Sequence, residues 1–204
     1  QIARGLVLSR PEISDHLWEP QTTKLLLHLI PDAATVVIGG AYFGDHALLA
    51  AQELQARPGG GHGVVHCLEM DASQLELCRY NAEQNGLYNL VYHHRALYSR
   101  DGVHLGLVGE DAAAFAEEVP RDADRAVPAT TLSRIAAQAG ADRLDLVMLD
   151  IEGGELEALR GGEAFLARPS GEAPDVIFEV HRHYTDWSRG LENTDIVRSL
   201  RERG

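Results

Sequence analysis

The second half of the chain carries a group of acidic residues directly after an apolar run. Asp150 lies near the end of the nearly continuous apolar stretch 144–151, and Glu152 and Glu155 follow it. Crowded carboxylates raise the pKa of at least one member and can hold a proton or a metal ion. Acidic residues also stabilise the start of a helix, which accounts well for Glu155 and poorly for Asp150. We therefore predict that Asp150 and Glu152 serve acid or base chemistry.

A second pair of candidate acid or base groups ends the next apolar run. The stretch 175–181 closes with Glu179 and His181. Histidine is the side chain whose ordinary pKa lies closest to neutrality, and a neighbouring carboxylate can orient it. A histidine in such a place is more often structural. This one is singled out because it follows a strand that is predicted to point toward a ligand.

A glycine-rich turn near residue 40 indicates a place where backbone approaches a ligand. Gly39, Gly40, Ala41 and Gly44 follow the apolar run 35–38 and precede a helical pattern. Glycine permits such an approach, and a helix N-terminus offers unpaired N–H groups. Alone, the turn is equally well explained by its own geometry. A carboxylate at the end of the following strand, Glu69, can accept hydrogen bonds from a ribose diol. Together these features favour a nucleoside cofactor, either NAD or S-adenosylmethionine.

The elements that must position these residues alternate between strands and helices. Strands are predicted at 35–38, 63–69, 90–97, 144–151 and 175–181, and helices at 45–55, 73–84, 131–139, 154–166 and 193–202. Within 100–127 we predict a short strand at 103–108 and a helix at 111–118. This alternation is typical of an α/β fold with a mostly parallel sheet that helices cover on both faces. Ligands of such sheets bind at the carboxyl ends of the strands.

Composition and charge exclude several classes of protein. The 18 basic and 31 acidic residues give a net charge of −13, which repels nucleic acid and anionic membranes. Lys24 is the only lysine, so a Schiff-base lysine elsewhere, a Walker-type phosphate loop and the Tyr-x-x-x-Lys pair of dehydrogenases are absent. No apolar run approaches the roughly 20 residues of a membrane span. Cys67 and Cys78 have no metal-ligand spacing, so we expect reduced thiols and a cytoplasmic location.

The acidic block resembles the signature of a known family. The segment 150–155, Asp-Ile-Glu-Gly-Gly-Glu, is followed by Leu159 and Gly161, and the whole resembles the D-[IV]-E-G-x-E-x-x-x-L-x-G pattern of FkbM-type methyltransferases. The strand at 174–181 and the Thr-Thr-Leu segment at 130–132 are similar to further blocks of that family. Upstream, Glu19-Pro20, the glycine turn, Glu69 and the stretch 81–89 occur in the family's order. The resemblance covers about residues 17–185.

This resemblance implies a Rossmann-like class I methyltransferase fold. It further implies S-adenosylmethionine as cofactor, with S-adenosylhomocysteine as product, and O-methylation of a hydroxyl on a small molecule, either a secondary metabolite or a sugar. By the same resemblance, the methionine part of the cofactor lies at the turn of Gly39, Gly40, Ala41 and Gly44, its ribose at Glu69, its base near Met70, Ala96 and Leu97, and its methyl group beside Asp150.

Transfer of a methyl group to a hydroxyl requires orientation of the two reactants and removal of the hydroxyl proton. We expect either His181 or the pair Asp150 and Glu152 to act as the base, with Glu179 orienting it. Three oxygen ligands would also suit Mg²⁺. Magnesium assistance through Asp150, Glu152 and Glu179 is therefore a further expectation.

The sequence differs from the family pattern at three places. Ile38 stands where the family has an acidic residue, Tyr42 replaces an asparagine, and the lysine before the acidic block is absent. These differences keep open a non-catalytic or degenerate methyltransferase-fold module that binds a partner. A nicotinamide-dependent dehydrogenase is the other alternative, because it shares the glycine turn and the strand-end acid.

The chain is predicted to form one domain, with an N-terminal helical or lid segment at 1–33 and a Rossmann-like core at 34–204. The fold usually continues from its last helix into an antiparallel hairpin, which this sequence does not show. We therefore expect the natural polypeptide to be longer.

Overall fold

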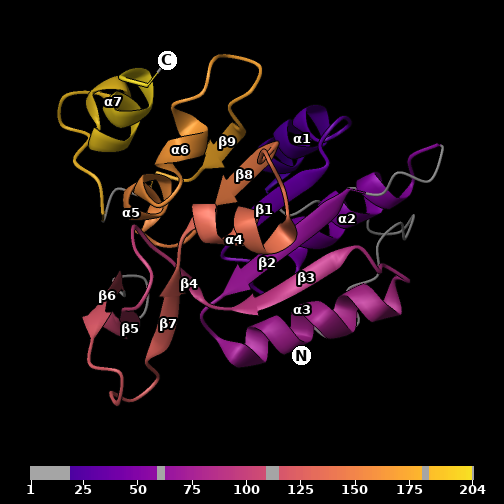
Figure 1. The fold of residues 1–204 in the computed structure, drawn as a ribbon, viewed down its shortest axis with the longest axis horizontal. Coiled ribbons are helices and arrows are strands. Elements are labelled where there is room, and N and C mark those ends of the chain that lie inside the picture. The colour runs from indigo at the N-terminus through magenta and orange to yellow at the C-terminus, as the bar shows by residue number, and fades with distance from the viewer. Residues whose placement is uncertain (1–18, 59–62, 109–114, 181–183, 204) are drawn as a thin grey trace.

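A sheet of five parallel strands forms the centre of the molecule (Figure 1). The computed structural model describes residues 19–58, 63–108, 115–180 and 184–203. The strands of the sheet are β1 (Thr35–Gly39), β2 (Val64–Glu69), β3 (Leu90–His94), β8 (Leu146–Leu149) and β9 (Asp175–Phe178). They lie in the order β3-β2-β1-β8-β9, and each neighbouring pair is parallel. The order reverses between β1 and β8, where open α/β sheets bind their ligands.

Helices cover both faces of this sheet, because successive side chains of a strand point to opposite faces. Val36 and Ile38 of β1 belong to one hydrophobic cluster and Val37 to another. The first cluster packs against α1 (Pro20–Leu29), α2 (Asp45–Gln55) and α3 (Ala72–Gln84). The second packs against α4 (Leu132–Ala139), α5 (Glu155–Arg160), α6 (Glu163–Leu166) and α7 (Asp195–Arg201), the last preceded by the 3-10 helix η3 (Leu191–Asn193). The predicted Rossmann-like α/β fold is thereby confirmed.

Side-chain caps fix the start of two helices that lead away from strand ends. The carboxylate of Asp71 accepts hydrogen bonds from the backbone N–H groups of Ser73 and Gln74, which otherwise lack partners at the first turn of α3. Thr131 caps α4 in the same way through Arg134, and Gly140 ends that helix in the left-handed conformation.

A smaller sheet lies beside the carboxyl end of β2. It contains β4 (Ala96–Leu97), β7 (Val127–Thr130), β5 (His104–Val108) and β6 (Phe115–Val119), in that order (Figure 1). The helix predicted at 111–118 is wrong over its described part, since residues 115–119 pair antiparallel with β5. Alanine and glutamate favour a helix there, but pairing with a neighbouring strand overrides so weak a preference. Residues 111–114 lie outside the described residues.

Two elements that are predicted as continuous are each divided in the structure. The strand predicted at 90–97 breaks at Arg95, so that β3 joins the large sheet and β4 the small one. The helix predicted at 154–166 divides into α5 and α6 at Gly161 and Gly162. A side chain on Gly161 would place its Cβ 2.2 Å from the carbonyl oxygen of Tyr98, which explains the glycine.

No helix within the described parts of the chain has the length and apolar character needed to cross a membrane.

Candidate active site

A large cavity opens at the carboxyl ends of the strands, where the sequence predicts a ligand. Its volume is about 860 Å³, within the usual range for small-molecule sites. Predicted site residues from several separate segments meet in it. Those that line the cavity are Gly39, Gly40, Glu69, Met70, Ala96, Leu97, Asp150, Glu152 and Glu179. Residues more than a hundred positions apart in the sequence are therefore brought to one place by the strand order.

Two of the described predicted site residues do not line this cavity. Ala41 and Gly44 are buried in the turn between β1 and α2, where the N–H of Gly44 donates to the carbonyl of Ala41. Gly44 also begins α2 with a φ of 98°, a conformation that favours glycine. His181 lies outside the described residues, and its role as a base stays a prediction.

The glycine turn joins the ends of three strands. Gly40 has a φ of 78°, and its N–H donates to the carbonyl of Leu68 at the end of β2. A Cβ at position 40 would lie 1.8 Å from the carbonyl oxygen of Asp150, well inside van der Waals contact. Only glycine lets β1 approach the residue after β8 so closely. The turn thus fixes the position of Asp150 relative to β1 and β2.

The carboxylate of Glu69 is held rigidly at the end of β2. Its Oε2 accepts a hydrogen bond of 2.9 Å from the N–H of Tyr42, and its Oε1 accepts one of 2.8 Å from the N–H of Asp71. Tyr42 donates from a left-handed backbone conformation with a φ of 45°. Each carboxylate oxygen can accept a further hydrogen bond. Glu69 is therefore oriented by the backbone and still able to receive two hydroxyl groups.

An apolar part of the cavity lies next to Glu69. It is lined by Leu68 of β2, by Met70 directly after that strand, by Ala96 and Leu97 of β4, and by Leu105 of β5. The hairpin of β5 and β6 is tied to the segment after β4 by the Arg100 guanidinium, which donates to both carboxylate oxygens of Glu118 at 2.6 Å. This region offers a flat aromatic ring an apolar surface beside a diol-binding carboxylate.

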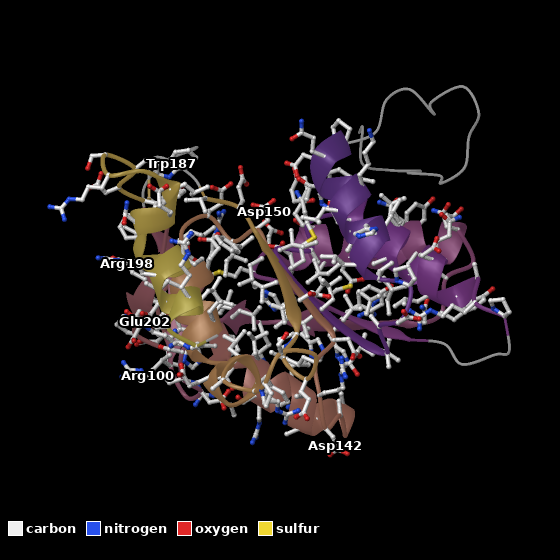
Figure 2. The ribbon with its side chains drawn as sticks, turned by 90° about the horizontal axis from the view of Figure 1, so that it is seen from above. Arg100, Asp142, Asp150, Trp187, Arg198 and Glu202 are labelled. Carbon is white, nitrogen blue, oxygen red and sulfur yellow. The ribbon has the colours of Figure 1, made fainter. Side chains whose placement is uncertain are left out.

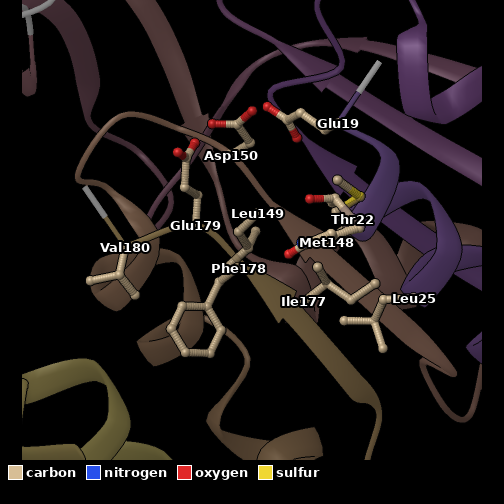
Figure 3. A pocket seen from close by; sticks show the side chains of 11 residues that line it. Glu19, Thr22, Leu25, Met148, Leu149, Asp150, Ile177, Phe178, Glu179 and Val180 are labelled. Carbon is tan, nitrogen blue, oxygen red and sulfur yellow. The ribbon is translucent and has the colours of Figure 1, made fainter. Parts of the chain in front are cut away.

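Three carboxyl groups converge at the opposite end of the cavity. Figure 3 shows the side chains of Asp150 and Glu179 pointing toward each other, with Glu19 directed toward Asp150 from the start of α1. Burial, a hydrogen bond with Glu179 and the charges of Glu179, Glu19 and Glu152 together raise the pKa of Asp150 to about 8, with burial the largest cause. At neutral pH Asp150 keeps its proton and donates it to Glu179. In Figure 2 Asp150 lies between α1 and α7.

The other acids of the signature have separate roles. The Oε1 of Glu155 accepts hydrogen bonds from the N–H groups of Ile151 and Gly153, at 3.1 and 3.3 Å, and so closes the turn before α5. Glu152 lines the cavity from a left-handed backbone conformation with a φ of 52°. Next to it, a Cβ on Gly153 would lie within 3.0 Å of the Tyr184 ring. The helix-start interpretation therefore holds for Glu155, and Glu152 lines the cavity.

The expected magnesium site gains no support. Among the described residues, no three His, Cys, Asp or Glu side chains are arranged so that they could hold a metal ion.

The cavity is strongly acidic. Of the described residues that line it, ten are acidic and one, Arg95, is basic. Such a lining attracts a cationic ligand and repels phosphate groups. The pyrophosphate of a nicotinamide cofactor would therefore be disfavoured here, whereas a sulfonium cation would be favoured.

No catalytic role was predicted for Glu19 from the sequence, although Glu19-Pro20 is part of the family resemblance. Glu19 precedes α1 with a φ of 40°, and its Oε2 lies 3.9 Å from the Nε2 of the buried His46.

Ile38 occupies the position at which the family pattern has an acidic residue. Ile38 is 2% exposed and packs in the core, but Asp45, from the first turn of α2, lines the cavity. Its pKa is raised by burial.

Comparison with known proteins identifies the family. A model of the methyltransferase FkbM domain matches residues 39–204, which is most of the chain. A search of curated protein sequences finds no match.

Similar solved structures include three methyltransferases. The FkbM methyltransferase of Methylobacillus flagellatus KT is 18% identical, with 75% of this chain and 34% of that chain covered and a TM-score of 0.48. A candidate O-methyltransferase from Klebsiella pneumoniae is 14% identical, with coverages of 93% and 68% and a TM-score of 0.49. An O-methyltransferase from Bacillus cereus, in complex with SAH, is 13% identical, with coverages of 94% and 70% and a TM-score of 0.43. On the family match, the chain belongs to the FkbM methyltransferase family.

Proposed function

We propose that this protein uses S-adenosylmethionine to methylate a hydroxyl group of a small molecule. The observation that carries the proposal is the acidic cavity at the strand ends, with a backbone-held carboxylate at one end and a proton-sharing carboxyl pair at the other. Membership of the FkbM family supports the same chemistry. Neither nucleic acid nor a membrane is expected as a partner, since both are anionic.

The residues of the cavity fit this cofactor. Glu69 would accept hydrogen bonds from its ribose, and the apolar surface of Met70, Ala96 and Leu97 would contact its base. Asp45 is the acid nearest in sequence to the glycine turn and is placed to take over from the missing acid at position 38. When bound, S-adenosylmethionine supplies a methyl group that its sulfonium charge already activates for displacement.

The protein must still orient the acceptor and remove its proton. Asp150 and Glu179 are the carboxyl groups best placed to do so, because they are hydrogen-bonded to each other and share a proton. The pair must first release that proton to solvent before it can accept one from a hydroxyl. A positive charge bound nearby favours this release. Turnover is therefore expected to rise with pH as pH approaches 8.

Replacing Glu69 by alanine tests the cofactor assignment. Loss of two hydrogen bonds to a charged carboxylate is expected to weaken S-adenosylhomocysteine binding by about 10- to 100-fold, or roughly 1.5–3 kcal/mol. Isothermal titration calorimetry measures this difference directly. Glu53→Ala, on the exposed side of α2, is the matched control: it removes the same charge and is expected to bind as the unmodified protein does. Equal binding by Glu69→Ala would refute the assignment.

A further inference from the structure

A second cavity lies beside the first and shares part of its wall. It has a volume of about 350 Å³ and is lined by residues of α1, β8 and β9. Its apolar wall includes Leu25, Met148, Ile177 and Val180, which are labelled in Figure 3. The volume is at the small end of the range for ligand sites, enough for a single ring.

The shared wall consists of carboxylates. Glu19, Asp150 and Glu179 line both cavities. The strand order of the large sheet explains part of this arrangement: the glycine turn and Glu69 follow β1 and β2, and Asp150 and Glu179 follow β8 and β9. The third carboxylate, Glu19, comes from the start of α1. The second cavity continues in the same direction, on the side of α1. A group that enters it meets the acid pair from the side opposite the cofactor features.

We propose that the second cavity is the acceptor subsite and that it takes a compact, cationic amino alcohol whose hydroxyl is next to a protonated amine. This proposal rests on the proposed function of the first cavity. An acceptor held there would meet Asp150 and Glu179 at its hydroxyl and the apolar wall at its hydrocarbon face.

Charge decides the class of acceptor. Three carboxylates and, among the described lining residues, no arginine, lysine or histidine face the second cavity. Because the pair of Asp150 and Glu179 must release its shared proton before transfer, one sulfonium cation then neutralises only one of the three negative charges. The remaining charge favours an ammonium group and disfavours a carboxylate or phosphate.

The apolar wall limits the shape of the acceptor. Ile177 is almost fully buried at the base of the cavity, and Leu25, 46% exposed, stands at its rim. A ring with one apolar face can cover both of these side chains while its polar edge faces the carboxylates.

In the transfer step the hydroxyl oxygen uses a lone pair to form the new O–C bond. The S–C bond breaks at the same time and leaves its electron pair on sulfur. The hydroxyl proton passes to the pair of Asp150 and Glu179.

The two methionines of the chain make the test direct, because one lies in each cavity. Met70 lines the first and Met148 the second. NMR spectra of isotope-labelled methionine methyl groups then report the two sites separately. S-Adenosylhomocysteine is expected to shift the Met70 signal. With it bound, 2-aminocyclohexanol is expected to shift the Met148 signal, with a dissociation constant at least about 5-fold below that of the corresponding diol. The anionic 2-hydroxycyclohexanecarboxylate is expected to leave Met148 unchanged.

Two variants of α1 provide the matched comparison. Leu25→Arg places a positive charge at the rim of the second cavity and is expected to weaken binding of the amine at least about 10-fold. Leu27→Arg makes the same change at an exposed position of the same helix that lines neither cavity, and it is expected to have little effect.

The two proposals fail in different ways. If S-adenosylhomocysteine shifts Met70 but the amine leaves Met148 unchanged, or binds no better than the diol or the carboxylate, the acceptor proposal is overturned and the proposed function stands. If S-adenosylhomocysteine does not shift Met70, the proposed function fails, and the acceptor proposal that rests on it is overturned too. Equal effects of Leu25→Arg and Leu27→Arg would also overturn the acceptor proposal.

Discussion

Gly40→Ala is expected to abolish S-adenosylhomocysteine binding and to lower the free energy of unfolding by about 3 kcal/mol or more. The new Cβ would lie 1.8 Å from the carbonyl oxygen of Asp150, and the φ of 78° is itself unfavourable for alanine. Relief of this collision requires the end of β8 to move away from β1. Such a movement displaces Asp150 from the cavity. Urea unfolding and calorimetric titration measure the two effects.

A second glycine separates strain from collision. Gly102 has a φ of 83°, and a Cβ there would have no atom within 4 Å. Gly102→Ala should therefore lose only about 1–2 kcal/mol, the cost of the left-handed conformation, and should bind S-adenosylhomocysteine normally. If Gly40→Ala behaves like Gly102→Ala, the close approach of the glycine turn to Asp150 does not hold the site together.

Asp150→Asn is expected to remove a pH-dependent preference for the sulfonium form of the cofactor. The pKa of Asp150 is about 8, so its charge appears between pH 7 and pH 9. S-Adenosylmethionine carries a sulfonium charge and S-adenosylhomocysteine does not, whereas their other charged groups are the same. The ratio of their affinities should rise about tenfold over this range, or by roughly 1.4 kcal/mol, in the unmodified protein. It should stay constant in Asp150→Asn. Calorimetry at both pH values measures the ratio, and identical slopes would contradict the assignment.

The same substitution has a predicted effect on stability that needs no ligand. Between the ordinary pKa of 3.8 and the raised value of about 8, the folded protein holds a proton on Asp150 that the unfolded chain releases. The free energy of unfolding therefore falls as pH rises through this range. Asparagine carries no such proton, so Asp150→Asn should be more stable than the unmodified protein at pH 9, by about 1 kcal/mol after allowance for solvent screening. If the difference in free energy of unfolding between Asp150→Asn and the unmodified protein were the same at pH 9 and at pH 5, the raised pKa would be refuted.

The sequence was sufficient to predict the large sheet and the edge at which the cavity opens. Its strands are short apolar runs whose ends coincide with Gly39, Glu69 and the residues before Asp150 and Glu179. Because all strands are parallel, every strand-end residue reaches the same edge. The order of the strands and the contact between Asp150 and Glu179 depend on packing. The sequence alone pointed to crowding among Asp150, Glu152 and Glu155, whereas the structure pairs Asp150 with Glu179.

The parts that sequence reasoning missed depend on contacts with distant residues. Phe115–Val119 reads as a helix but pairs with His104–Val108 as a strand. Glu19 reaches the site because α1 packs on α2 through Leu26 and neighbouring apolar residues, a contact that no local pattern reveals. Its position just before a proline-started helix was the only local signal.

Calorimetric titration of the chain with S-adenosylhomocysteine, with NADH in a parallel titration, tests the central claim most directly. The acidic cavity and the backbone-held Glu69 predict micromolar binding of S-adenosylhomocysteine and no heat from NADH. Binding of NADH, or binding of neither compound, would contradict the assignment of this cavity to S-adenosylmethionine.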